Sequence, residues 1–255
     1  MQVTLKWITP RAEVEVVEIA RVSNINAKAE ANNPDRLLTY LIDHAHWSPF
    51  EMASACFEVY TTRDIARQML RHRSFSFQEF SQRYADVNTL GDWDARECRM
   101  QHPKNRQLSV SLSDHPAHKP ILAWWEDAQK RVHELTATLY TEAIRRGLAK
   151  EVARVILPEG LAPSRLYMAG TLRSWLHYCA LRTTDGTQKE HREVAQAILV
   201  VLRDQAPVIF SQRNVERLQE CMKPPVRQVS TQQNTSRPST RFGDILCTWL
   251  RSFRD

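Results

Sequence analysis

Glycine is scarce in this sequence, with six residues among 255. Their positions form no GxGxxG, GxxxxGK[ST] or GxSxG pattern. The common glycine-rich phosphate loops and the nucleophile elbow of α/β-hydrolases are therefore excluded. We expect any phosphate that the protein binds to be held by side chains.

Paired cysteines and long apolar runs are also missing. The five cysteines are odd in number and form no CxxC pair, which argues against a disulfide framework and against a thiolate zinc site. No apolar run approaches the ~18 residues that a membrane span needs, and the first residues lack the apolar core of a signal peptide. We therefore expect a cytoplasmic protein with no membrane partner.

The net charge of +6 suggests nucleic-acid binding as one possible function. Residues 223–255 hold six basic and two acidic residues, so the rest of the chain is nearly neutral. A module that binds RNA or DNA through this basic segment stays open as an alternative, and its binding would depend steeply on salt. The nearly neutral body makes nucleic acid an unexpected partner.

Hydrophobic periodicity predicts a helix-rich α+β protein. Strands are predicted at 3–10 and 52–62, and helices at 12–23, from Pro34, at 63–73, 122–139, 149–157, 171–182 and 188–205. The polar segment 85–118 is expected to be a long loop or lid. Residues 1–222 would form the folded domain, and residues 223–255 a basic, disordered tail with a short terminal helix.

The strongest local feature is the segment 63–84, RDIARQMLRHRSFSFQEFSQRY. On a helix, Arg63, Arg67 and Arg71 lie four residues apart, where like charges repel by a few tenths of a kcal/mol per pair. Such a face needs an anion, either an internal carboxylate or the phosphate of a ligand. Guanidinium groups suit phosphate, and the Gln, Ser, Glu and Phe residues that follow suit a nucleotide.

This segment resembles the RHRx7S signature of the flavin-dependent thymidylate synthases, the ThyX family, in Arg71-His72-Arg73 followed by Ser81. The segments ARVS (20–23), HWSPFE (46–51), ARVILP (153–158) and TLRSWLHYCALR (171–182) also resemble that family, in the same order. The resemblance covers residues 1–210. It implies a single α+β domain with a small antiparallel sheet, with residues 1–222 as the catalytic domain.

The resemblance implies that the chain methylates dUMP to dTMP, with methylenetetrahydrofolate as carbon donor, FAD as cofactor and NADPH as reductant. It also implies a homotetramer whose sites lie between subunits. By the same match, Arg182 is the catalytic residue that favours ionisation of the uracil ring. The FAD-binding positions are Ser23, Ser48, Arg71, His72, Arg73, Glu79, Thr171 and His177. The dUMP-binding positions are Gln68, Arg71, Glu79, Ser81, Gln82, Arg83, Arg154 and Arg182.

The sequence departs from the family pattern at a few positions. Met52 stands where a histidine is common, Gln82 replaces a frequent glycine, and Thr171 and His177 stand where some members have asparagine. Because Met52 and Gln82 are unusual, an enzyme that only oxidises NADPH stays open. A related enzyme that methylates another pyrimidine nucleotide, such as UMP, also stays open, because residues that contact the ribose 2′ position cannot be picked out from the sequence. His44 and His46 could be imagined as metal ligands, but we expect no metal site.

Overall fold

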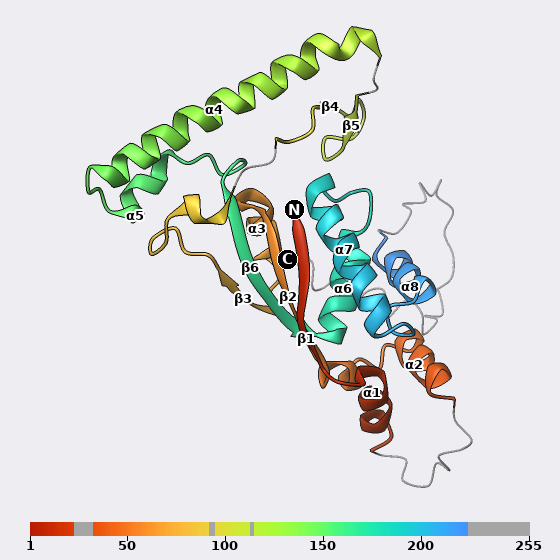
Figure 1. Cartoon of the computed structure of the whole chain (residues 1–255). Coiled ribbons are helices and arrows are strands. Elements are labelled where there is room, and N and C mark those ends of the chain that lie inside the picture. Colours follow the sequence, from red (N-terminus) through yellow and green to blue (C-terminus); the bar gives the residue numbers. More distant parts are fainter. Residues whose placement is uncertain (23–32, 92–94, 113–114, 224–255) are drawn as a thin grey trace, which may run out of the picture.

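A four-stranded antiparallel sheet, in the order β1-β2-β6-β3, forms the centre of the fold (Figure 1). The computed structural model describes residues 1–22, 33–91, 95–112 and 115–223. The strands are β1 (Gln2–Ile8), β2 (Ser54–Thr62), β3 (Phe75–Glu79) and β6 (Pro163–Thr171). The expected α+β class with a small antiparallel sheet is confirmed.

Helices and short 3-10 turns connect these strands. The helices are α1 (Ala12–Ala20), α2 (Pro34–Asp43), α3 (Arg63–Met69), α4 (Lys119–Arg145), α5 (Lys150–Ala153), α6 (Leu172–Arg182), α7 (Lys189–Gln205) and α8 (Gln212–Met222). The 3-10 turns are η1 (Ser48–Glu51), η2 (Val87–Leu90), η3 (Pro116–His118) and η4 (Arg154–Ile156). A separate two-stranded hairpin consists of β4 (Arg99–Gln101) and β5 (Ser109–Ser111). Across the described parts of the chain, every helix is too short or too polar to cross a lipid bilayer.

The pairing of β6 brings the start of β3 and the start of α6 to the same end of the sheet. Phe75, the first residue of β3, pairs with Gly170 near the end of β6. The Phe75 ring occupies the space above Gly170, where a Cβ atom would lie 2.4 Å from the ring. The segment before β3 and helix α6 are thus fixed side by side.

Helix α6 is anchored to the sheet by a buried aromatic residue. The Nε1 of Trp175 donates to the carbonyl oxygen of Ala55 in β2 at 3.1 Å, and its ring centroid lies 4.9 Å from that of Phe57. Helices α7 and α8 pack against α6 (Figure 1). Because α6 is enclosed in this way, side chains at its ends are held by a rigid element.

Most of the predicted elements are present, but three predictions need correction. The helix predicted at 63–73 ends at Met69, because Phe75 already pairs with β6 and the chain must turn before it. Segment 85–118 is not one long loop, since it contains η2 and the β4–β5 hairpin. The helix predicted at 149–157 is one turn of α5 followed by η4. The expected tail, 223–255, lies outside the described residues except for Lys223.

Helix α4 confirms the predicted amphipathic helix, but its apolar stripe stays largely uncovered. The helix extends away from the sheet (Figure 1). Val132, Leu135 and Leu139 are 45%, 61% and 48% exposed. In α4 only Gln129 and Tyr140 are buried. A row of exposed apolar side chains on a long helix is typical of a surface that a partner covers.

Candidate functional site

The Arg71-His72-Arg73 segment forms the turn between α3 and β3. The N–H of His72 donates to the carbonyl oxygen of Met69, the last residue of α3, at 3.0 Å. The His72 side chain is half-buried, whereas Arg71 and Arg73 are exposed. The turn therefore directs the imidazole into the protein and leaves the two guanidinium groups accessible.

His72 contacts Arg182, the last residue of α6. The Nε of Arg182 donates to the Nε2 of His72 at 2.9 Å. Burial, together with the nearby Arg182 charge, lowers the pKa of His72 to about 4. His72 is therefore neutral near pH 7, and its hydrogen is assigned to Nδ1 because Nε2 accepts a bond. Burial also lowers the pKa of Arg182, but an arginine side chain stays protonated in proteins.

Gln68 in α3 belongs to a chain of polar contacts beside this pair. Its Oε1 lies 3.2 Å from the Nδ1 of His191, whose Nε2 lies 3.1 Å from the hydroxyl of Tyr178. The Nε2 of Gln68 donates to the Oε1 of Gln188 at 2.7 Å. His191 and Tyr178 are buried in α7 and α6, so three helices fix the position of Gln68.

Two of the three arginines on the basic face of α3 are paired with carboxylates of the same chain, Arg63 in a partly buried position and Arg67 at the surface. Arg63 lies 4.0 Å from Oε1 of both Glu79 and Glu159, and the Nε of Arg67 donates to Glu159 at 3.2 Å. Burial and the charges of Arg67 and Arg154 lower the pKa of Arg63. Arg71 lies beyond the end of α3 and is exposed. The internal carboxylates thus compensate Arg63 and Arg67, and Arg71 remains to meet an external anion.

Glu79 lies at the other end of β3 from His72. Its Oε1 accepts a hydrogen bond from the Ser164 hydroxyl at 2.9 Å. The charge of Arg154 acts on Arg63, which faces Glu79, so Arg154 belongs to the same neighbourhood. The structure thus groups Glu79 with Arg154 and separates both from the Arg182–His72 pair.

The residues after β3 form a tight turn that exposes one cation. The N–H of Arg83 donates to the Oγ of Ser81 at 3.4 Å, and the Arg83 guanidinium pairs with Glu151 at 3.3 Å. Gln82 between them is 4% exposed, and its Nε2 has no hydrogen-bond partner among the described residues. An amide nitrogen buried without a partner is costly and therefore indicates a missing partner.

Two further unpartnered nitrogens lie among the predicted FAD-binding residues on η1 and α6. The ring of Trp47, the residue before Ser48, lies 4.9 Å from that of His177. Within the described residues, neither Nε1 of Trp47 nor Nε2 of His177 has a hydrogen-bond partner. Burial, with the charge of Arg173, lowers the pKa of His177 to about 4. Ser48 is exposed beside this pair.

Thr171 has a structural function in addition to any contact with a cofactor. It is the N-cap of α6, and its Oγ1 accepts the N–H of Ser174 at 3.2 Å. The Ser174 hydroxyl in turn donates to the carbonyl oxygen of Ser74 at 3.2 Å. The cap of α6 is therefore tied to the turn that carries His72. Ser23, the remaining predicted FAD-binding position, lies outside the described residues.

The structure does not bring all the predicted residues into one place. Gln68, His72 and Arg182 meet at the start of β3, whereas Ser81 and Arg83 lie beyond its end. A strand rises about 3.3 Å per residue, so the ends of β3 are roughly 13 Å apart. Within one chain, these two groups cannot contact the same small substituent of a ligand.

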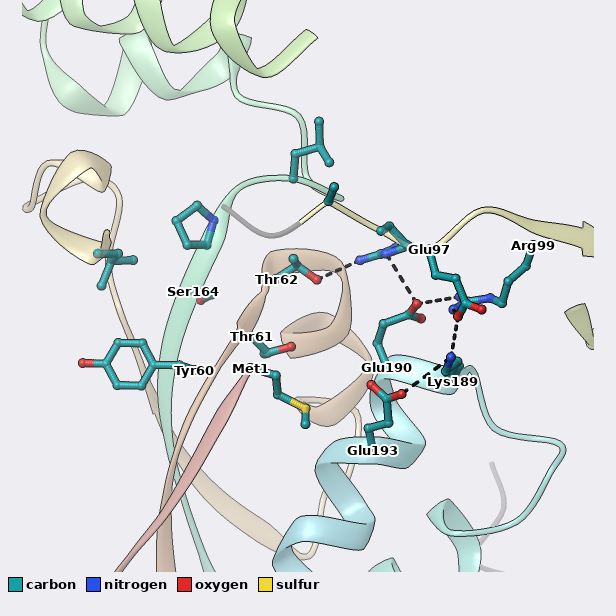
Figure 2. A pocket seen from close by; sticks show the side chains of 15 residues that line it. Met1, Tyr60, Thr61, Thr62, Glu97, Arg99, Ser164, Lys189, Glu190 and Glu193 are labelled. Atoms are coloured by element: carbon teal, nitrogen blue, oxygen red, sulfur yellow. Dashed lines mark hydrogen bonds and ion pairs between the residues drawn. The ribbon is translucent and has the colours of Figure 1, made fainter. Parts of the chain in front are cut away.

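Two cavities lie next to these groups, and neither is lined by Arg71, His72 or Arg73. One, of about 330 Å³, lies at the ends of β2 and β6 and is lined by Thr61, Ser164 and Glu190 among others (Figure 2). The other, of about 520 Å³, lies between the β4–β5 hairpin and the start of α7, with Gln188 in its wall. The first cavity is connected to the candidate residues by Ser164, whose hydroxyl donates to Glu79. The second cavity is connected to them by Gln188, which accepts a hydrogen bond from Gln68.

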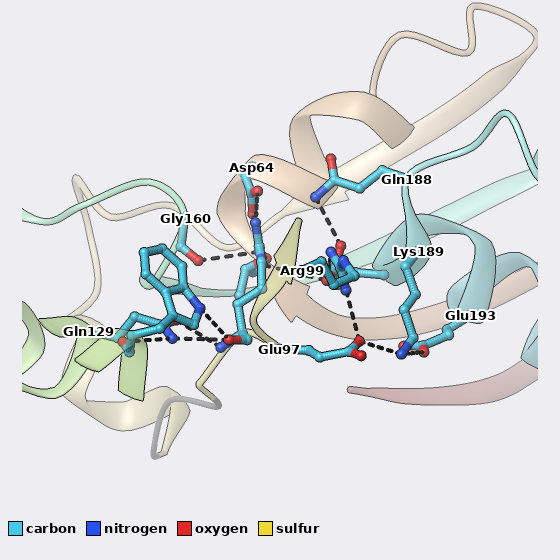
Figure 3. Close-up of polar contacts among 12 residues, drawn as sticks. Asp64, Glu97, Arg99, Gln129, Gly160, Gln188, Lys189 and Glu193 are labelled. Atoms are coloured by element: carbon cyan, nitrogen blue, oxygen red, sulfur yellow. Dashed lines mark hydrogen bonds and ion pairs between the residues drawn. The ribbon is translucent and has the colours of Figure 1, made fainter. Parts of the chain in front are cut away.

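Most charges around the cavities are paired, which favours a structural function for them. Arg96 donates to Asp64 at 2.6 Å and to Thr62 at 2.9 Å, and its backbone carbonyl accepts the indole N–H of Trp125 at 2.9 Å (Figure 3). Hydrogen bonding with Asp64 raises the pKa of Arg96. These contacts fasten α4 to the start of α3. Among the described residues, no three His, Cys, Asp or Glu side chains are gathered as metal ligands would be.

Comparisons with known proteins agree with the residue pattern. The model of a family described as thymidylate synthase complementing protein matches residues 4–208. A flavin-dependent thymidylate synthase from Synechocystis is 45% identical over 190 residues, which is 74% of this chain and 84% of that protein. A probable flavin-dependent thymidylate synthase from Paramecium bursaria Chlorella virus 1 is 42% identical over 198 residues, 78% of this chain and 88% of that protein. The chain belongs to the flavin-dependent thymidylate synthase family. The family predicted from the sequence is thus confirmed.

A solved structure extends the likeness to the fold. A UMP/dUMP methylase from Streptomyces cacaoi, bound with 5-Br UMP, superposes with a TM-score of 0.71 at 26% sequence identity. The match covers 85% of this chain and 94% of that chain. A second structure of that methylase, bound with 5-Br dUMP, gives a TM-score of 0.69 at 28% identity and covers 82% and 92% of the two chains.

The residues on η1 and α6 fit a flavin of this family. A flavin ring carries carbonyl oxygens and ring nitrogens that can pair with a neutral imidazole and an indole N–H. The unpartnered nitrogens of Trp47 and His177 are of this kind and lie beside the predicted position Ser48. The chemistry of these two buried nitrogens is thus compatible with a flavin.

The sequence motifs do not single out His191, Tyr178 or Gln188. His191 stands three and four residues before Val194 and Ala195, on the buried stripe of α7. A histidine on an apolar helix face is a signal that the sequence did contain. Its partner Gln68, however, lies more than 120 residues away and could be identified only from the fold.

Proposed function

We propose that this chain catalyses the reductive methylation of dUMP to dTMP. Methylenetetrahydrofolate supplies the one-carbon unit, reduced FAD supplies the hydride that completes the methyl group, and NADPH regenerates the reduced flavin. Family membership supports the reaction and the flavin. FAD would be held by Ser23, Ser48, Arg71, His72, Arg73, Glu79, Thr171 and His177.

The contact between Arg182 and His72 is the observation that supports the chemistry most directly. Methylation at C5 of uracil requires that carbon to act as a nucleophile, and loss of the N3 proton promotes this because the resulting negative charge, shared by N3 and the ring carbonyls, raises the electron density at C5. Arg182 can stabilise this charge, as an oxyanion-hole donor does. Its partner His72 is neutral, because burial lowers the pKa of His72 to about 4. The positive charge of Arg182 is thus oriented without being cancelled by that partner.

The nucleotide would be held by residues from both ends of β3. Gln68, Arg71 and Arg182 lie at one end, and Glu79, Ser81, Gln82, Arg83 and Arg154 lie at or beyond the other. Arg71 and Arg83 are exposed cations suited to a phosphate. Cysteine is not needed as a nucleophile, and burial raises the pKa of Cys179 in α6 well above its usual range.

The distance between these groups supports a homotetramer with sites between subunits. One chain separates its two groups by the length of β3, so a second chain would supply the group that the first cannot bring near. The exposed apolar stripe of α4, Val132, Leu135 and Leu139, provides a surface that assembly would cover. Light scattering coupled to size-exclusion chromatography tests this, and a monomer that turns over dUMP would contradict it.

A catalytic domain comprising residues 1–222 would contain all of these groups. The family match spans residues 4–208, and α8 ends at Met222. The substrates are phosphorylated or strongly anionic metabolites of the cytoplasm, and we place the enzyme there. Residues 223–255 would be a basic tail outside the site.

The absorption spectrum of the purified protein tests the proposed function first. A yellow protein whose flavin band shifts with dUMP, and which forms dTMP from dUMP, methylenetetrahydrofolate and NADPH, would support it. UMP belongs in the same assay, because the structural neighbour is described as a UMP/dUMP methylase. A colourless protein that cannot be reconstituted with FAD would contradict the proposal.

A further inference from the structure

The hydrogen bonds around Gln68 can have only one order of donors and acceptors, because a carboxylate at one end of the series must accept. The Oε2 of Glu190 accepts a hydrogen bond from the Nε2 of Gln188 at 2.9 Å. Although burial acts to raise it, hydrogen bonds from Arg99 and Gln188 hold the pKa of Glu190 below its ordinary value. An ionised carboxylate can only accept, so the amide of Gln188 must turn its nitrogen toward Glu190.

This orientation fixes the next amide along the chain of contacts. With its nitrogen on Glu190, Gln188 presents Oε1 to Gln68, which must donate through its own Nε2 at 2.7 Å. Gln68 then presents its Oε1 to the Nδ1 of His191 at 3.2 Å. The carboxylate of Glu190 thus determines which end of the Gln68 amide faces the imidazole (Gln188 and its neighbours are shown in Figure 3).

His191 can satisfy Gln68 in one tautomer of the neutral ring only. Its Nδ1 must carry the hydrogen that Gln68 accepts, and its Nε2 is then an acceptor for the Tyr178 hydroxyl at 3.1 Å. Burial, with the charges of Arg182 and His72, lowers the pKa of His191 to about 3. The ring is therefore neutral at neutral pH and cannot become a donor on both sides. His191 is fully buried, so the ring cannot rotate freely.

We propose that His191 is a positioning residue for nucleotide binding: its Nδ1–H and the Gln188–Glu190 pair lock the Gln68 amide in one orientation, which leaves one N–H and one lone pair of Gln68 for the pyrimidine nucleotide. This inference rests on the proposed function, because Gln68 is assigned to the nucleotide by family resemblance. His191 acts through Gln68 and does not itself touch the substrate. Without His191, the Gln68 oxygen loses its donor, and only the bond to Gln188 still holds the amide.

Substitutions at His191 separate this function from simple packing. His191→Leu replaces the imidazole with an apolar side chain of similar size and removes the N–H. His191→Asn places an amide N–H close to the position of Nδ1 and leaves the Tyr178 hydroxyl without its acceptor. We expect His191→Leu to weaken dUMP binding by roughly 10- to 100-fold, with FAD content unchanged. His191→Asn should recover most of that loss.

A double-mutant cycle with Gln68→Leu gives the decisive measurement. Dissociation constants for dUMP are taken from the flavin absorbance shift of the FAD-loaded enzyme. If His191 acts through Gln68, His191→Leu has no further effect once Gln68 is leucine. If the two losses multiply, or if His191→Asn binds dUMP as weakly as His191→Leu while holding FAD normally, the proposal is overturned.

The wild-type enzyme and a second variant, at Gln188, keep the test interpretable. Should wild type bind FAD but no pyrimidine nucleotide, the proposed function fails before the cycle begins. If His191→Leu does not fold with FAD, Gln188→Met replaces it, because Gln188 is only half-buried and bonds to the other end of the Gln68 amide. Gln188→Met should weaken dUMP binding and lose this effect in the Gln68→Leu background. An unchanged dissociation constant for Gln188→Met would contradict the locked amide.

Discussion

Arg182 is held by the lone pair of a neutral imidazole, with its Nε 2.9 Å from the Nε2 of His72. A carboxylate at the same position would orient the guanidinium equally well, but it would cancel the charge that the uracil anion needs. Burial of His72 prevents its protonation, because it lowers the pKa of that ring to about 4. The family's RHR motif and its YCALR segment are thus connected by one hydrogen bond.

Arg182→Ala should abolish methylation and leave flavin bound. Removing a single oxyanion-type donor costs about 10²- to 10³-fold in rate, and here a full charge is lost as well. The measurement is dTMP formation alongside the visible spectrum of the flavin. Arg192→Ala is a matched control, because Arg192 pairs with the exposed Asp185. The Arg192→Ala enzyme should form dTMP at the normal rate. Persistent dTMP formation by Arg182→Ala would remove Arg182 from the mechanism.

Ser81→Ala should weaken dUMP more than FAD. Ser81 lies beyond β3, where its Oγ accepts the N–H of Arg83 and so shapes the turn that presents that cation. If Ser81 holds dUMP as proposed, losing its hydroxyl should raise the dissociation constant of dUMP by about tenfold. Titration of dUMP and measurement of bound FAD distinguish the two ligands, with Ser76→Ala on the exposed side of β3 as control. Loss of FAD with normal dUMP binding would mean that the predicted positions are misaligned.

The stability of the apoprotein should fall as the pH drops from about 6.5 to 4. His177 has a folded-state pKa of about 4 against an ordinary value of 6.5, so in this range the unfolded chain binds more protons than the folded one. The contribution of His177 is fully present above the unfolded pKa and is lost as pH falls toward the folded value, by up to about 3 kcal/mol. His72 and His191, whose pKa values burial lowers to about 4 and about 3, add losses of the same sign. Urea unfolding at several pH values measures the sum. His177→Asn, which does not titrate, should make the curve less steep by the share of His177, and an equally steep curve would contradict the assignment.

Gly170→Ala should lower the stability of the protein and shift the turn that carries Arg71, His72 and Arg73. The new Cβ would lie 2.4 Å from the Phe75 ring, which is itself packed 4.7 Å from the ring of Trp175 and cannot move away easily. Overpacking of this kind costs about 1–3 kcal/mol. Thermal unfolding and dUMP binding should both decline. Gly160→Ala is the control, because a Cβ there meets no atom within 4 Å, and equal effects of the two substitutions would contradict the steric argument.

The local sequence pattern predicted those elements whose apolar residues lie on the buried face. The apolar spacing of Leu37, Leu38, Leu41 and Ile42 and the N-terminal Pro34 correctly indicated α2, where Leu37 is half-buried and the other three apolar residues are buried. Strand β6 was missed, because Pro163 at its first position and Gly170 near its end are residue types typical of turns. Its alternating buried residues, Leu166 and Met168, are stabilised by pairing with β2 and β3 on both sides.

The candidate site was predictable only as far as a family motif extends. The motif identified His72 and Arg182 separately, but their hydrogen bond depends on α6 packing against the turn before β3. The end of α3 at Met69 is likewise decided by the pairing of β3, not by the helix propensity of the residues that follow. The positions of Gln68 and His191 are set by contacts between helices, which no local pattern contains.

Deletion of residues 223–255 should leave turnover intact. The family match ends at residue 208, and α8 supplies the last buried side chains of the described chain, Asn214, Val215, Leu218 and Cys221. A deletion that begins at residue 223 keeps these, whereas one that begins at residue 212 removes all four and should destabilise the enzyme by several kcal/mol. dTMP formation and thermal unfolding of both truncated proteins give the comparison. Loss of activity in the shorter deletion, with unchanged stability, would place the basic tail in the site or in the assembly.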